Sequence, residues 1–157
     1  MADNRLQEMD LGKGAYVVHD PTYEVEWTAA ISSILGDHYE KVDSHQLIGM
    51  FLIIFANKAL VPAITGVQKS HLPTGHFALL GNKGGTAIRF QCYDTTMCFV
   101  DVHLYHVPEA ASRRTGDVRR ILKDLVFDDV DSIRQHDHIF FFGDLNYRVS
   151  SLEGYVD

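Results

Sequence analysis

The sequence predicts a protein of the α+β class, in which sheet and helix form packed layers. Three observations lead to this class: several runs of branched and aromatic residues are typical of β-strands, two segments carry apolar residues at helical spacing, and most strand-like runs precede the second helical segment. A chain of 157 residues is long enough for one domain with a buried core. We therefore expect one globular unit.

Two helices are expected, at residues 22–35 and 108–127. The first follows Pro21 and stops at Gly36, which are typical residues for the two ends of a helix. Its apolar side consists of Trp27, Ile31, Ile34 and Leu35. The second begins at Pro108 and runs through an Arg-rich stretch. Its apolar side consists of Val118, Ile121, Leu122, Leu125 and Val126.

The expected strands are mostly antiparallel neighbours and lie at residues 45–57, 63–70, 86–93, 97–104 and 138–142. The first contains the longest apolar run, residues 47–56, which is about half as long as a membrane-spanning helix needs to be. We interpret this run as a buried strand and limit any membrane contact to the periphery. The last strand, rich in phenylalanine, is also expected to be buried.

Charge and composition exclude several classes of function. The formal net charge is −7 and no run of Lys or Arg is present, which argues against general nucleic-acid binding. The nine histidines lack the partners and spacing of a zinc site, so structural zinc is not expected. Cys92 and Cys98 lie in neighbouring predicted strands, where a disulfide is conceivable. Because the first residues do not resemble a signal peptide, we expect reduced thiols in the core.

Polar residues directly after buried strands are the best candidates for chemistry, because a strand holds its terminal side chains rigidly at the rim of a sheet. After residues 138–142, Gly143 allows a tight turn, Asp144 offers a carboxylate and Asn146 offers an amide. Such a pair could orient a water nucleophile and hold a phosphoryl oxygen. A purely structural Asp/Asn turn explains the same spacing.

Two further segments are weaker candidates. His103 ends a predicted strand, and with His106 it could donate a hydrogen bond to a phosphate, although a histidine at a strand end is often structural. Residues 81–85 place Lys83 among three glycines and could offer N–H groups and an ammonium to an anion. A glycine-rich hairpin explains them equally. They do not form a Walker A loop, because the spacing and the residue after the lysine are wrong.

In combination, these segments resemble the inositol polyphosphate 5-phosphatases, members of the superfamily of magnesium-dependent endonucleases, exonucleases and phosphatases. The resemblance runs almost continuously from Tyr23 to Arg148. It is carried by Leu47-Ile48-Gly49-Met50, Val67-Gln68 with Gly75, Gly81-Asn82-Lys83-Gly84-Gly85 with Arg89, Phe99-Val100-Asp101-Val102-His103-Leu104, Arg113-Arg114 with Asp117, and Phe142-Gly143-Asp144-Leu145-Asn146-Tyr147-Arg148. The last string is highly specific, and Leu6-Gln7-Glu8 also matches a strand end of the family.

The resemblance implies part of a two-sheet β-sandwich flanked by helices, the DNase I-like fold, with residues 1–157 forming part of a catalytic domain. It implies removal of the 5-phosphate from phosphoinositides or inositol polyphosphates, in lipid signalling. Glu8 would bind Mg²⁺, and Lys83 and Arg148 would contact the substrate or support the fold. The catalytic residues would be His103 on the phosphate, Asp144 on the attacking water and Asn146 on a phosphate oxygen.

The sequence also departs from the family pattern. Asp101 and Thr115 stand where the family usually has Asn, and the family's upstream Asn strand and later Asp-His pair have no counterpart. We therefore expect an incomplete sandwich and catalytic set with an open sheet face, so that either the chain is a fragment or a partner covers this face. We further expect a cytoplasmic protein that contacts the cytosolic membrane face peripherally.

Two other functions remain open. A non-catalytic member of the family could bind a phosphoinositide or a protein, which the incomplete catalytic set favours. A nuclease of the same superfamily would share the Glu, His and Gly-Asp-x-Asn pattern, but the acidic balance and the string Asn146-Tyr147-Arg148 favour the phosphatase group.

Overall fold

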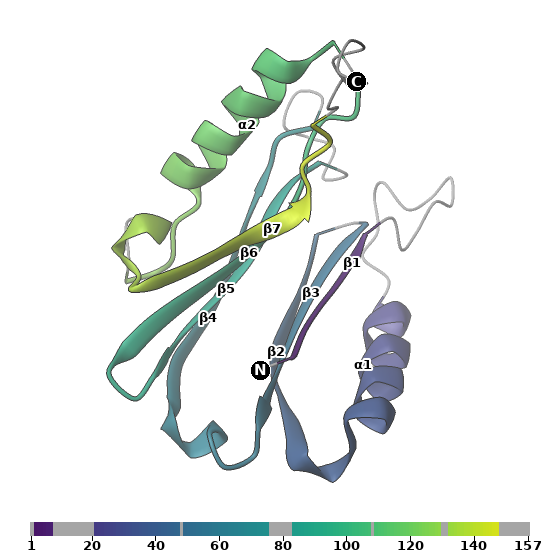
Figure 1. Cartoon of the computed structure of the whole chain (residues 1–157), viewed down its shortest axis with the longest axis vertical. Coiled ribbons are helices and arrows are strands. Elements are labelled where there is room, and N and C mark those ends of the chain that lie inside the picture. Colours follow the sequence, from purple (N-terminus) through teal and green to yellow (C-terminus); the bar gives the residue numbers. More distant parts are fainter. Residues whose placement is uncertain are drawn as a thin grey trace, which may run out of the picture.

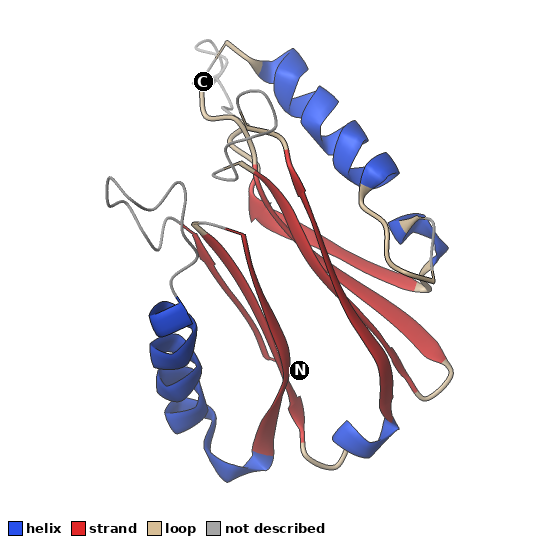
Figure 2. Cartoon of the chain, turned by 180° about the vertical axis from the view of Figure 1, so that it is seen from behind, coloured by secondary structure: helices blue, strands red, loops and turns tan. Residues whose placement is uncertain are grey.

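Two β-sheets lie face to face, and each is covered on its outer side by one helix (Figures 1 and 2). The computed structural model describes residues 2–7, 21–47, 49–75, 83–107, 109–129 and 132–147, with the backbone alone at 2–7 and 21. The layers run in the order α1, first sheet, second sheet, α2. This arrangement confirms the predicted α+β class and the two-sheet sandwich flanked by helices.

The first sheet has the strand order β1-β3-β2, and all its strands are antiparallel. Its strands are β1 (Ala2–Gln7), β2 (Tyr39–Leu47) and β3 (Met50–Asn57). Central β3 is buried from Met50 to Ala56. The single strand expected at 45–57 is wrong, because Leu47 pairs with Met50 and the chain therefore reverses between them.

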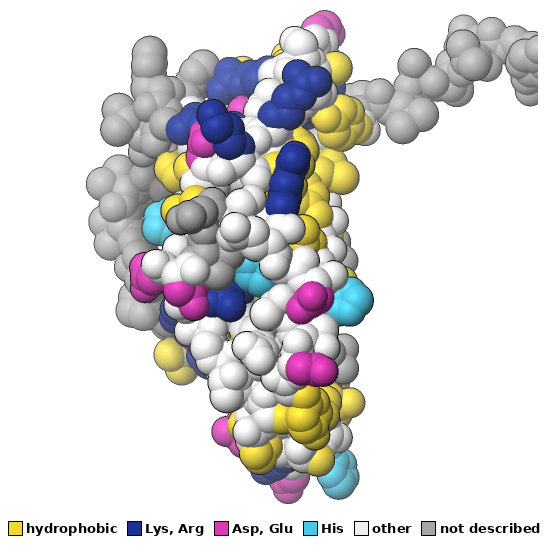
Figure 3. Space-filling model, turned by 90° about the vertical axis from the view of Figure 1, so that its left-hand side faces the viewer, with side chains coloured by type: hydrophobic (Ala, Val, Ile, Leu, Met, Phe, Trp, Pro, Cys, Tyr) yellow, Lys and Arg dark blue, Asp and Glu magenta, His cyan; other side chains and the backbone are white. Residues whose placement is uncertain are grey.

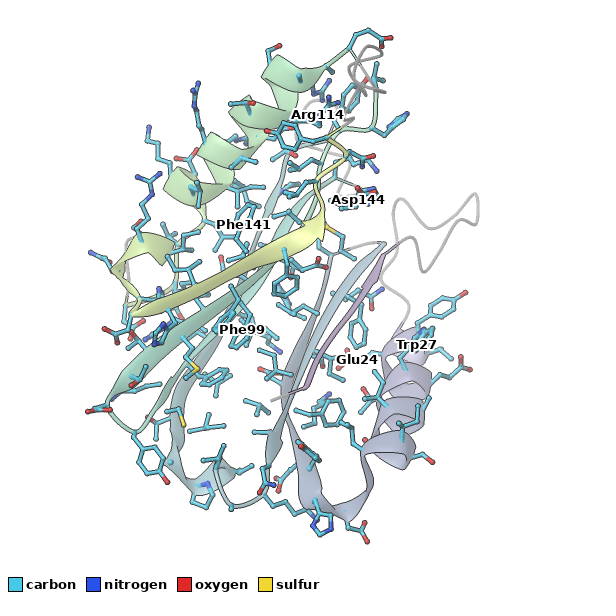
Figure 4. All side chains as sticks on the ribbon, viewed as in Figure 1. Glu24, Trp27, Phe99, Arg114, Phe141 and Asp144 are labelled. Carbon is cyan, nitrogen blue, oxygen red and sulfur yellow. The ribbon has the colours of Figure 1, made fainter. Side chains whose placement is uncertain are left out.

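Helix α1 (Pro21–Leu35) covers the outer face of this sheet and agrees with the helix expected at 22–35. Ile31 and Leu35 pack against phenylalanine and isoleucine side chains of β3, whereas Ile34 is 83% exposed. Trp27 is also exposed, so only part of the expected apolar side faces the sheet. Glu24 lies on the side of α1 that faces the sheet (Figure 4), where its carboxylate accepts hydrogen bonds from Lys41 and Ser44 of β2. Polar contacts therefore complete the packing of α1.

The second sheet has the strand order β4-β5-β6-β7. Its strands are β4 (Ile64–Pro73), β5 (Gly84–Cys92), β6 (Thr95–His103) and β7 (His138–Asp144). The first three are antiparallel, but β7 runs parallel to β6 after the chain crosses the sheet through α2 (Ala111–Asp124). Short 3-10 turns are η1 (Gly36–His38), η2 (Val61–Ala63) and η4 (Ile133–Gln135).

Helix α2 is shorter at both ends than the segment expected at 108–127. Its inner side packs Ile121 against β5 and β6, with Val118 and Leu122 beside it, and Leu125 follows directly after its end. Val126 lies beyond the helix and is exposed. Among the described helices, neither is long and apolar enough to cross a lipid bilayer.

The core between the sheets joins Leu52 and Ile54 of β3 to Ile88, Phe90 and Phe99 of the second sheet. Burying each such side chain stabilises the fold by roughly 1.5–3 kcal/mol. The ring of Phe99 stacks on that of Phe90, with centroids 5.7 Å apart. This core fixes the two sheets against each other.

Strand β7 is an edge strand, because among the described strands it pairs with β6 alone. Phe140 stacks on Phe99 at 4.6 Å between ring centroids but remains 45% exposed, and Ile139 is also exposed. The sequence-based expectation of a buried strand is therefore wrong at Ile139 and Phe140. Phenylalanine-rich sequence predicted the strand correctly but not its place at the edge of the sheet.

Both cysteines are free thiols in the core, as expected. In the register of β5 and β6, Cys92 lies opposite Thr95 and Cys98 opposite Arg89, so the two cysteines are not cross-strand partners. Burial raises the pKa of the Cys98 thiol to about 12. We therefore expect this thiol to be unreactive in the native protein at neutral pH.

Polar pairs close the sandwich where β2 faces β4. Lys69 Nζ lies 3.1 Å from Asp43 Oδ1, and His45 Nε2 lies 3.2 Å from His71 Nδ1. Burial, followed by the nearby positive charges of His71 and Lys69, lowers the pKa of His45 from 6.5 to about 4. His45 is therefore neutral in the folded protein at mildly acidic pH.

Stability should fall as the pH is lowered from about 6.5 to about 4, because the unfolded chain binds a proton at His45 in this range and the folded chain does not. The measurement is urea unfolding across this pH range, with His45→Gln and the exposed His38→Gln as matched variants. The loss of stability should be smaller in His45→Gln and unchanged in His38→Gln. Equal pH dependence in all three proteins would contradict the assignment.

Candidate active site

The start of β5 and the ends of β6 and β7 lie side by side at one end of the second sheet. Gly84 at the start of antiparallel β5 pairs with His103 at the end of β6, and His103 pairs with Asp144 at the end of parallel β7. Lys83 directly precedes Gly84 and therefore lies at the same end of the sheet. Strand register alone brings together three of the residues that the sequence singled out.

A cation, an imidazole and a carboxylate lie close together at this end of the sheet. Lys83 Nζ is 2.7 Å from His103 Nε2, and Asp144 Oδ2 is 3.7 Å from the same nitrogen. Lys83 Nζ also lies 3.4 Å from Nδ1 of the same ring, so the ammonium sits against the imidazole. His103 is 3% exposed, whereas the Asp144 side chain is 49% exposed. The carboxylate is thus the member of the cluster that is most open to water.

The Asp144 carboxylate also organises the turn that follows β7. Its Oδ1 accepts a hydrogen bond from the Asn146 backbone N–H at 2.9 Å, and Asn146 has a left-handed backbone with φ of 50°. The Asn146 side chain donates to the Leu104 carbonyl at 3.0 Å. The structural turn considered from the sequence is therefore present. It also fixes the amide of Asn146 beside the segment that follows His103.

Gly143 is required by the close approach of β7 to β6. Its φ is 124°, and a Cβ at this position would lie 2.1 Å from the Val102 carbonyl oxygen and 2.6 Å from Asp101 Oδ1. Asp101, one of the two departures from the family pattern, is fully buried beneath this contact. Only glycine allows Asp144 to stand directly beside His103.

The other expected site residues lie at different places. His106 is exposed on the segment after β6, where its ring lies 5.4 Å from that of Tyr105. The described contacts do not connect it with Lys83, His103 or Asp144. Glu8 and Arg148 lie outside the described residues, as do residues 81 and 82 of the glycine-rich segment. Their expected roles stay predictions.

The residue roles that the sequence analysis missed are supporting ones. The Thr74 N–H donates to the Lys83 carbonyl at 2.8 Å, and Arg114 is buried at the end of α2 that lies near Asp144 (Figure 4). The sequence contains a signal for the burial of Arg114, because helical spacing places it on the same side of α2 as the apolar Val118 and Ile121. Thr115, the second departure from the family pattern, lies 3.1 Å from the Tyr147 hydroxyl.

Within the described part of the chain, no group of three or more His, Cys, Asp or Glu side chains could hold a metal ion. Asp144 offers a carboxylate oxygen at the site. Mg²⁺ commonly takes only one or two protein carboxylates and keeps several waters, whereas a zinc site takes three or four protein ligands. The described donor at the site, one carboxylate, is of the kind that a hard cation with few protein ligands takes.

Comparison with known proteins identifies the family. The model of the endonuclease/exonuclease/phosphatase family 2 matches residues 5–157. The chain belongs to this family. Within the family, it is 38% identical over 156 residues to the type II inositol 1,4,5-trisphosphate 5-phosphatase of Mus musculus, covering 94% of this chain and 16% of that protein. It is 36% identical over 137 residues to inositol-1,4,5-trisphosphate 5-phosphatase 1 of Schizosaccharomyces pombe, covering 83% and 13%.

A solved structure of the same family agrees with the fold. It is the inositol polyphosphate 5-phosphatase domain of SPsynaptojanin in complex with inositol (1,4)-bisphosphate and a calcium ion, which matches with a TM-score of 0.80 and 34% identity. The match covers 94% of this chain and 44% of that chain. The expected group within the family, the inositol polyphosphate 5-phosphatases, is confirmed. The chain spans less than half the length of each of these three family members.

Replacing Gly143 with Ala should destabilise the protein by about 2–4 kcal/mol, because the added Cβ meets backbone of β6 at a φ that favours glycine. The matched control is Gly116→Ala in α2, where nothing lies within 4 Å of the added Cβ. That change should stabilise the helix by about 0.5–1 kcal/mol. Urea unfolding measures both, and equal effects would contradict the close approach at Gly143.

Proposed function

We propose that this chain forms part of the catalytic domain of a phosphatase that removes the 5-phosphate from phosphoinositides or inositol polyphosphates. The observation that carries the proposal is the convergence of Lys83, His103 and Asp144 at one end of the second sheet. Further support comes from the names of its relatives and from the inositol (1,4)-bisphosphate bound in the structure of the SPsynaptojanin domain.

The geometry suits transfer of a phosphoryl group to water. The ammonium of Lys83 and the imidazole of His103 would meet the phosphate oxygens, where positive charge and hydrogen-bond donors stabilise the developing negative charge. The half-exposed carboxylate of Asp144 would orient the attacking water and accept its proton. The water oxygen bonds to phosphorus as the bond between phosphorus and the inositol oxygen breaks, and the inositol oxygen takes a proton from solvent and leaves as a hydroxyl. Asn146, held against Leu104, would hold a phosphate oxygen.

We propose Mg²⁺ as the working ion. The related domain binds calcium, which is also a hard divalent cation that prefers oxygen ligands. A bound Mg²⁺ would neutralise charge on the phosphate. Glu8 is the carboxylate that the family resemblance implies as its ligand, which leaves Asp144 to act on the attacking water.

We also propose that the protein acts in the cytoplasm and contacts the cytosolic face of a membrane peripherally. Phosphoinositides are lipids, so an enzyme that removes their phosphates has to reach head groups at the membrane surface. Lys and Arg side chains gather over α2, near the end of the molecule that carries the site (Figure 3). Positive side chains there would be attracted to an anionic lipid surface.

Replacing Asp144 with Asn should lower phosphate release from inositol 1,4,5-trisphosphate in the presence of Mg²⁺ by about 100-fold or more. Asn keeps an oxygen that can accept the Asn146 N–H but cannot take the proton of water. Asp144→Ala, which also removes the turn contact, should be at least as damaging. Chelation of Mg²⁺ should abolish release by the parent chain.

The matched control is Asp124→Asn, an exposed carboxylate at the end of α2, which should leave phosphate release unchanged. Equal release by the parent, Asp144→Asn and Asp144→Ala proteins would contradict the catalytic role of Asp144. Inositol phosphate binding without any release would support the non-catalytic alternative. Cleavage of plasmid DNA under the same conditions would support the nuclease alternative.

A further inference from the structure

Arg114 is a buried cation in the first turn of α2, where its side chain is 1% exposed. It lies on the inner side of the helix, in line with Val118 and Ile121, which pack onto the second sheet. Figure 4 shows Arg114 and Asp144 at the same end of the molecule. Burying a guanidinium costs free energy unless its N–H groups find partners, so the contacts of Arg114 are needed to keep it in this position.

One set of contacts fixes the segment that follows β6. Arg114 Nη1 donates to the carbonyl oxygens of Val107 at 2.5 Å and Tyr105 at 3.3 Å. The neighbouring Arg113 places its guanidinium 3.9 Å from the centre of the Tyr105 ring, which also lies 5.4 Å from the ring of His106. Two successive arginines of α2 therefore hold the segment that begins at the end of the His103 strand.

A second set of contacts fixes the segment that follows β7. The Arg114 guanidinium lies 5.4 Å from the centre of the Tyr147 ring, and the hydroxyl of Tyr147 lies 3.1 Å from Thr115 Oγ1. Tyr147 directly follows Asn146, whose backbone N–H and side chain bond to Asp144 and to the Leu104 carbonyl. The first turns of α2 therefore contact both segments that leave the site.

We infer that Arg114 is a positioning residue, which holds the segments after β6 and β7 together so that Asp144 and Asn146 keep their place beside His103. The inference rests on the proposed function. The planar guanidinium can donate to two carbonyls and lie near an aromatic ring at once, which the single ammonium of lysine cannot reproduce. Displacement of catalytic groups by about 1 Å can cost about 100-fold in rate, so a supporting residue affects turnover without touching the substrate.

The test compares Arg114→Lys with Arg119→Lys, an exposed residue of the same helix. Hydrogen exchange of the full chain should become about tenfold faster at residues 104–107 and 144–147 in Arg114→Lys, while β5 and β6 keep their protection. With inositol 1,4,5-trisphosphate, kcat should fall about 10- to 100-fold while KM stays within about threefold. Arg119→Lys should match the parent protein in both measurements.

The outcomes separate this inference from the proposed function. Parent-like exchange at both segments in Arg114→Lys would overturn the inference, whatever the activity. If the parent chain releases no phosphate, the proposed function fails, and exchange still decides the positioning role. Should Arg114→Lys not fold, Tyr147→Leu decides, because it removes the ring that the Arg114 guanidinium contacts and leaves Arg114 itself in place. Faster exchange confined to residues 144–147 would then support the inference, and parent-like exchange would overturn it.

Discussion

The parallel pairing of β6 with β7 is the constraint on which the candidate site depends. It places His103 directly opposite Asp144, and it requires the backbone of β7 to approach Val102 at a position that only glycine tolerates. An antiparallel partner would have brought the start of β7 to this edge instead. The crossover through α2 makes the parallel pairing sterically feasible and carries Arg114 to the same end of the sheet.

The candidate site combines a buried residue, His103, with an exposed one, Asp144. His103 is buried at the end of β6, where Lys83 Nζ lies 2.7 Å from its Nε2. Asp144 lies at the exposed end of an edge strand, where a carboxylate remains accessible to water. The turn to Asn146 joins the two regions, because the Asp144 side chain accepts the Asn146 N–H and the Asn146 side chain donates to the Leu104 carbonyl.

Sequence patterns predicted the helices and most of the strands, since side-chain periodicity depends on local geometry. They failed at β2 and β3, because β3 is buried on both faces and its apolar residues continue through the hairpin to Leu47. They also failed to place β7 at the edge, because burial of Phe140 depends on neighbouring strands. Asp144 and Asn146 could be predicted as site candidates, because they follow a strand directly in the sequence. The contact between Lys83 and His103 could not, because these residues are 20 positions apart and meet only through the pairing register of β5 and β6.

The single tryptophan of the chain has a consequence for spectroscopy. Trp27 lies partly exposed on α1, in the outer layer on the far side of the first sheet from the strands that carry His103 and Asp144 (Figure 4). Intrinsic tryptophan fluorescence will therefore report on the surroundings of α1. Occupancy of the candidate site will leave this emission nearly unchanged, so an optical probe of that region has to be introduced near the ends of β6 and β7.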